Sequence, residues 1–80
     1  MNQTEIDQLC EEGVALYSEA RYDEAVKKFS LAAEHGHAHA QFCLGFCYKL
    51  GRGVVQSHER GAEWYAKAAS QALTSLTSRI

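Results

Sequence analysis

The chain has 80 residues and no proline, and no apolar run approaches the roughly 20 residues that a membrane-spanning helix needs. With 46% hydrophobic and 22% charged residues, this composition favours an ordered helical domain over a disordered tail. The first residues lack the basic and apolar segments of a secretory signal. The formal charge is only −2, so we expect neither nucleic acid nor an anionic membrane as partner. We therefore expect a soluble, cytoplasmic, single-domain protein.

The chain contains only three cysteines, which is an odd number. The three thiols of Cys10, Cys43 and Cys47 cannot all pair within one chain. Cys43 and Cys47 are four residues apart on a predicted helix, where their Cβ atoms run side by side, which is poor geometry for a disulfide. We expect reduced thiols, as in the cytoplasm.

Apolar residues recur at intervals of three and four in four stretches, which is typical of amphipathic helices. Start and stop signals bound these stretches: a first helix over residues 4–18 capped by Thr4, a second opened by Asp23 and closed by Gly36, a third closed by Gly51, and a fourth capped by Ser57. Helical spacing continues in the tail over residues 70–80. The tail is predicted either to extend the fourth helix or to form a helical cap.

The chain contains an internal repeat. Residues 25–35 match residues 61–71 at a constant spacing of 36, so that Phe29 corresponds to Tyr65. The earlier helices match at a spacing of 32, with Gly13 corresponding to Gly45. A period of this length indicates stacked helix-turn-helix units, and the difference places additional residues in the loop Gly51–Ser57.

The second unit carries its apolar, small and glycine residues at the spacing of a known repeat: Ala40, Leu44, Gly45, Tyr48, Gly51, Gly53, Val54, Trp64, Tyr65, Lys67, Ala68 and Ala69. In this it resembles the Sel-1-like repeat, a relative of the tetratricopeptide repeat. The first unit is similar to a plain tetratricopeptide unit, through Gly13, Tyr22, Ala25, Phe29 and Ala32. The resemblance implies an all-α fold, a short α-solenoid of two helix-turn-helix repeats with four antiparallel helices. Residues 1–80 form one domain, with repeats over about 5–36 and 37–72 and a C-terminal helical cap or extension over 73–80.

Two positions depart from the family pattern. Gly61 stands at the usual alanine position, and a glycine within a helix costs about 1 kcal/mol. Lys28 stands where the family has tryptophan, so we expect it to be exposed or to lay its stem along the surface.

One cluster resembles a metal site: His35, His37, His39, Cys43 and Cys47. The last three would span about 12 Å of one helix, whereas zinc requires each ligand within about 2.0–2.3 Å. One ion therefore cannot bind all three side chains. Zinc binding by His39 and Cys43 together with a further ligand is a remote alternative. No glycine-rich phosphate loop or nucleophile elbow accompanies the thiols, so we predict no catalytic residue, no metal ligand and no cofactor.

In related repeat proteins the first helix of each pair lines a concave groove that holds a partner segment. Carried onto this chain, the resemblance nominates as partner-binding residues Asp7, Cys10, Glu11, Val14, His39, Phe42, Cys43, Phe46 and Lys49. Phe42 and Phe46 lie one turn apart, on the helix face opposite the Ala40, Leu44 and Cys47 stripe. Two exposed phenylalanines would form an apolar contact site, unless one packs under the N-terminal helix or the tail.

These observations predict a non-enzymatic protein interaction module, an adaptor or scaffold that binds a peptide or helix of a partner protein in the groove. The alternative is self-association as a structural homodimer or assembly unit, because two repeats leave an end face uncovered.

Overall fold

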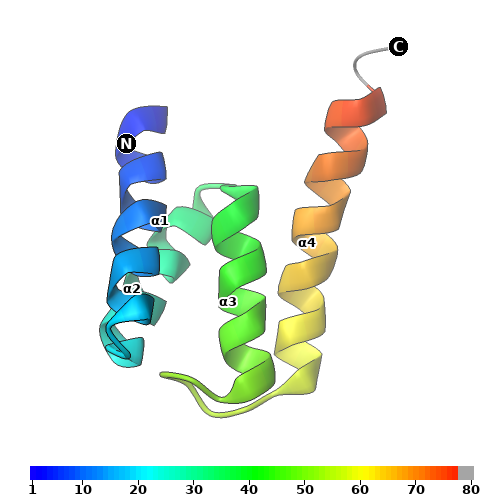
Figure 1. The fold of residues 1–80 in the computed structure, drawn as a ribbon. Helices are drawn as coiled ribbons and strands as arrows, with labels where there is room; N and C mark the ends of the chain where they lie inside the picture. The colour runs from blue at the N-terminus through cyan, green and yellow to red at the C-terminus, as the bar shows by residue number, and fades with distance from the viewer. Residues whose placement is uncertain (78–80) are drawn as a thin grey trace.

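The computed structural model describes the backbone of residues 1–77 and the side chains of residues 1–71. Over this range the chain forms four helices and no strand: α1 (Gln3–Ser18), α2 (Tyr22–Glu34), α3 (Ala38–Leu50) and α4 (His58–Thr77). Each helix runs opposite to the one before it, and consecutive helices pack side by side (Figure 1). The predicted all-α class and the four helices are confirmed.

Three helices begin at a side-chain cap: one cap differs from the prediction, one was predicted, and the His37 cap of α3 was not predicted. Asn2 accepts a hydrogen bond from the Glu5 N–H at 2.8 Å, so the prediction that Thr4 caps α1 is wrong. Asn and Thr both cap well, and the earlier cap lengthens the helix by about half a turn. Ser57 caps α4 as predicted, since its hydroxyl accepts from the Arg60 N–H at 3.2 Å.

Helices α1 and α2 end in the same way. The residue after the helix C-cap adopts a left-handed conformation, and the N–H of the residue that follows it bonds back to a carbonyl in the last turn. In α2 this left-handed residue is Gly36, as predicted, with φ 86°. In α1 it is Ala20, with φ 62°, although an L-residue other than glycine is strained in this region.

Replacing Ala20 with glycine is therefore expected to stabilise the protein by about 1 kcal/mol. The matched control is Ala15→Gly in the exposed part of α1, where the same substitution is expected to cost about 1 kcal/mol. Urea unfolding measures both free energies. Destabilisation by Ala20→Gly would contradict the left-handed turn.

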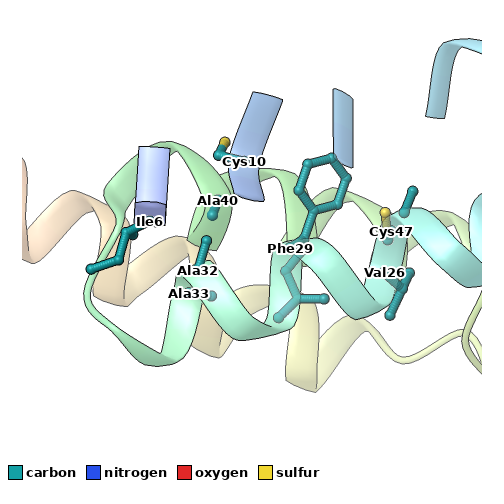
Figure 2. Close-up of a cluster of buried hydrophobic side chains, with 10 residues drawn as sticks. Ile6, Cys10, Val26, Phe29, Ala32, Ala33, Ala40 and Cys47 are labelled. Carbon is teal, nitrogen blue, oxygen red and sulfur yellow. The ribbon is translucent and has the colours of Figure 1, made fainter. Parts of the chain in front are cut away.

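Phe29 lies at the centre of the core. Its side chain is 2% exposed and its ring points from α2 toward α1, among buried residues of α1, α2 and α3 (Figure 2). The buried apolar residues are Ile6, Cys10, Ala25, Val26, Phe29, Ala32, Ala33, Ala40, Leu44 and Cys47. Most of these are small, so the helices approach closely around a single aromatic ring.

The two hairpins share a glycine-to-aromatic contact. A Cβ atom on Gly13 would lie 2.6 Å from the Phe29 ring, and one on Gly45 would lie 3.0 Å from the Tyr65 ring. These are the residues that the internal sequence match pairs. In the second hairpin a Cβ on Gly61 would also lie 2.9 Å from the Gly45 carbonyl oxygen. The helix-propensity cost expected at Gly61 is thus offset by the close approach of α3 and α4, which only glycine allows here.

The loop Gly51–Ser57 turns back beneath α3 toward the α1–α2 connection (Figure 1). Gly51 and Gly53 have φ 69° and 75°, as their predicted role in the turn requires. A Cβ on Gly53 would lie 2.5 Å from the Tyr22 carbonyl oxygen, and Val54 packs against the core. The loop therefore connects the second hairpin to the first.

Helix α4 continues without a break to Thr77, so the tail extends the fourth helix. The predicted cap over residues 73–80 lies outside the described side chains, and its last three residues lie outside the described backbone. No helix in the described part of the chain has the length and apolar content to cross a membrane.

Candidate functional site

An apolar groove of about 320 Å³ lies between α1 and α3, with the Phe29 ring of α2 also contributing to its lining. The lining residues are Val14, Tyr17, Ser18, Phe29, His39, Phe42, Cys43 and Phe46. The first helices of the two hairpins, α1 and α3, supply seven of these eight lining residues. Helix α2 supplies only Phe29.

Three large apolar side chains of the groove are exposed to solvent. The exposed fractions are 41% for Val14, 55% for Phe42 and 39% for Phe46. Each phenylalanine has one aromatic neighbour: the Phe42 ring centre is 5.1 Å from that of Tyr65, and the Phe46 ring centre is 6.5 Å from that of Tyr17. Neither phenylalanine is covered by the N-terminal helix or by the described part of α4, so the predicted exposed pair is present.

Five of the nine nominated residues line the groove: Val14, His39, Phe42, Cys43 and Phe46. The nomination of Cys10 is wrong, because its side chain is 3% exposed and belongs to the core. Position 10 shares a face of α1 with Val14 and Tyr17, but it is buried in the core while these two residues line the groove. Glu11 and Lys49 are exposed but do not line the groove.

Sequence reasoning missed three lining residues: Tyr17, Ser18 and Phe29. The first two follow Val14 by three and four residues, so helical spacing alone could have identified them. Phe29 is a core residue with a side chain that is 2% exposed, and it also borders the groove.

Polar side chains bound the groove at its two ends. At the end where Tyr17 lies, Arg52 donates a hydrogen bond to the Tyr17 hydroxyl at 2.6 Å, with its guanidinium over the rings of Tyr17 and Tyr22. At the other end, His39 stacks on His37 with ring centres 6.4 Å apart.

His37 has a structural role that the sequence did not indicate. Its Nδ1 accepts from the Ala40 N–H at 3.1 Å and caps α3, while its Nε2 lies 3.0 Å from the Asp7 carboxylate. One neutral tautomer, protonated on Nε2, satisfies both contacts. Asp7 is therefore held beside the N-terminus of α3 and not inside the groove.

All three cysteines are free thiols, and none is activated. Burial raises the pKa of Cys43 to about 11, with smaller contributions from Cys10 and Cys47. Burial also raises the pKa values of Cys10 and Cys47. Within the described residues, no group of three or more histidine, cysteine or acidic side chains is arranged to hold a metal ion.

The raised pKa predicts slow alkylation of Cys43 despite its position in the groove. At pH 8 iodoacetamide should modify it on the order of 100 times more slowly than it modifies glutathione, because the thiolate is the reactive form. The rate should rise as the pH approaches 11. The raised pKa also favours the folded state below about pH 9, and this contribution is lost as the pH rises toward 11. Peptide mapping by mass spectrometry measures the rate, and glutathione-like reactivity at pH 8 would contradict the burial.

Comparison with known proteins finds similarity to segments of three longer chains. The protein is 40% identical over 60 residues to DAP3-binding cell death enhancer 1 of Rattus norvegicus, an alignment that covers 72% of this chain and 12% of the relative. It is 34% identical over 59 residues to the exopolysaccharide production negative regulator of Rhizobium meliloti (strain 1021), covering 74% and 22%. It is 32% identical over 56 residues to chitin synthase regulatory factor 2 of Schizosaccharomyces pombe, covering 70% and 11%.

The chain thus spans less than a quarter of the length of each of these curated relatives. No protein-family model matches it, and no solved structure matches it significantly.

Proposed function

We propose that the chain is a non-enzymatic protein interaction module whose α1–α3 groove binds a segment of a partner protein. The observation that carries the proposal is the exposure of Val14, Phe42 and Phe46 around one apolar groove. Exposed large apolar side chains that gather at one concave site are typical of interaction surfaces. In a chain of 80 residues this surface represents apolar area that is left out of a small core.

The same proposal includes the repeat architecture, a short α-solenoid of a tetratricopeptide-like and a Sel-1-like unit. Its support is the glycine-to-aromatic contact that recurs in both hairpins at positions matched in the sequence. The relatives' names point in the same direction, since one describes a binding protein and two describe regulators.

An enzymatic role for the groove has little chemical support. His39 and Cys43 both line it, but the raised pKa leaves the Cys43 thiol protonated and weakly nucleophilic at neutral pH. The three free thiols suit a reducing compartment, so we propose the cytoplasm as the site of action.

The proposal is tested by partner capture from lysate of the source cells with wild-type protein and Phe42→Glu. A buried carboxylate cannot be accommodated in an apolar contact, so captured proteins should fall at least tenfold. The matched control is Leu31→Glu, which places the same charge on an exposed leucine of α2 that does not line the groove. Equal capture by wild type and Phe42→Glu would contradict the proposal.

Self-association through the groove gives a different result. Sedimentation velocity over a concentration series would then show a dimer that Phe42→Glu dissociates and Leu31→Glu does not. A wild-type monomer at all concentrations, together with Phe42-dependent capture, favours a separate partner.

A further inference from the structure

The end of the groove at His39 is acidic. His37 stacks on His39 and is held by Asp7 at 3.0 Å, and the exposed Glu11 lies one turn further along the same face of α1. Two carboxylates therefore lie at this end of the groove, one on the Asp7 side chain that contacts His37 and one on the exposed Glu11.

The opposite end is basic. Arg52 is fixed on the Tyr17 ring there, and the exposed Lys49 follows Phe46 by one turn on α3. The two cations therefore lie at the end of the groove that is farther from Asp7.

Two acidic groups near the basic end are already paired. Arg21 lies 3.5 Å from Glu19 and 2.7 Å from Glu24. These two carboxylates are therefore partly neutralised, and the cations of the loop and of α3 remain available to a partner.

The groove offers almost nothing to a partner's backbone. Its lining consists of side chains on helices whose own backbone groups are bonded internally, and one of its few polar groups, the Tyr17 hydroxyl, already accepts from Arg52. An extended peptide would leave its N–H and C=O groups facing phenylalanine and valine, which costs free energy. A helix satisfies its own backbone and presents only side chains.

We propose that the occupant is an amphipathic helix of a partner protein, oriented with a basic end over Asp7 and Glu11 and an acidic end over Lys49 and Arg52. This inference rests on the proposed function and specifies the chemistry of its partner. Asp7 and Tyr17, whose side chain Arg52 contacts, are ten residues apart on α1, which is about 15 Å along its axis, so the opposite charges of the helix should be separated by about ten or eleven residues. In an extended segment the same separation would take about five residues.

Selection from a random peptide library tests the charge pattern directly. Peptides of about 16 residues, long enough to span the groove as helices, are selected by mRNA display on the wild-type protein. Peptides that also bind Phe42→Glu are removed. We expect the remaining sequences to have apolar residues at intervals of three and four, with Lys or Arg at one end and Asp or Glu about eleven positions away.

A protein with one charge exchanged at each end of the groove provides the second arm. Glu11→Lys combined with Lys49→Glu changes two exposed residues, and a thermal melt verifies that the variant folds. Peptides selected on the wild type should bind this variant on the order of tenfold more weakly at low salt, and the difference should shrink at high salt. Selection on the variant should return peptides with no preferred charge order relative to α1, because Asp7 and Arg52 leave each end without net charge, and spin labels at the peptide ends detect this by NMR.

The outcomes separate this inference from the proposed function. Groove-dependent peptides without a charge pattern, or with opposite charges about five residues apart, would overturn the oriented helix and leave the groove as a binding site. A selection that returns no Phe42-dependent peptide would overturn the oriented helix, while partner capture in the preceding section would still decide the proposed function.

Discussion

Phe29→Ala is expected to leave the protein largely unfolded at 25 °C. Removing a buried phenylalanine costs about 3–5 kcal/mol, through lost burial and the cavity left behind. A single core in a chain of this size rarely supplies more than about 3–5 kcal/mol in total. Phe29 is 2% exposed, and most of the other buried apolar residues are alanine or cysteine, which are too small to fill the space.

Circular dichroism at 222 nm measures the loss of helix directly. The control is Leu31→Ala on the same helix, where the side chain is 44% exposed and the expected change is within about 0.5 kcal/mol. A Phe29→Ala protein that retains full helicity and a cooperative melt would show that the core does not depend on this ring.

Gly45→Val is expected to destabilise the protein by about 3 kcal/mol. The new Cβ would lie 2.9 Å from the Gly61 carbonyl oxygen and 3.0 Å from the Tyr65 ring, so α3 and α4 would have to separate. Backbone cannot move aside as a flexible side chain does. Gly45→Ala should cost less, because alanine's higher helix propensity offsets part of the clash.

The matched control for this substitution is Ala66→Val, at an exposed position of α4. It adds a β-branched residue without a clash and should cost about 0.5 kcal/mol of stability. Chemical unfolding measures all three variants. Equal stability of Gly45→Val and wild type would mean that the helices do not approach as closely as the structure shows.

The all-helical class and the element order could be predicted because local signals agree along most of the chain. Apolar spacing gave the helices, and the glycines at 36, 51 and 53 gave the turns that the structure contains. The left-handed turn at Ala20 could not be predicted, because an alanine in the sequence does not indicate a positive φ as a glycine does. The cap of α3 by His37 was missed for a similar reason, since histidine is not a usual capping residue.

The groove could be predicted only in part. The resemblance indicated which helices line it, and the spacing of Phe42 and Phe46 indicated an exposed pair. Cys10 and Tyr17 are seven residues apart and share one face of α1, so the packing of this helix against its neighbours decides which part of that face is buried in the core and which part lines the groove. Amphipathic spacing in one helix does not contain that information.

Site-specific photo-crosslinking tests the central claim most directly. Phe46 is replaced by p-benzoylphenylalanine in one variant and Leu31 in another, and each protein is irradiated in lysate of the source cells. The account predicts covalent adducts with the proteins captured by the wild type from position 46, and none of these from position 31. Adducts of equal yield from both positions, or adducts with these partners from position 31 alone, would contradict binding in the α1–α3 groove.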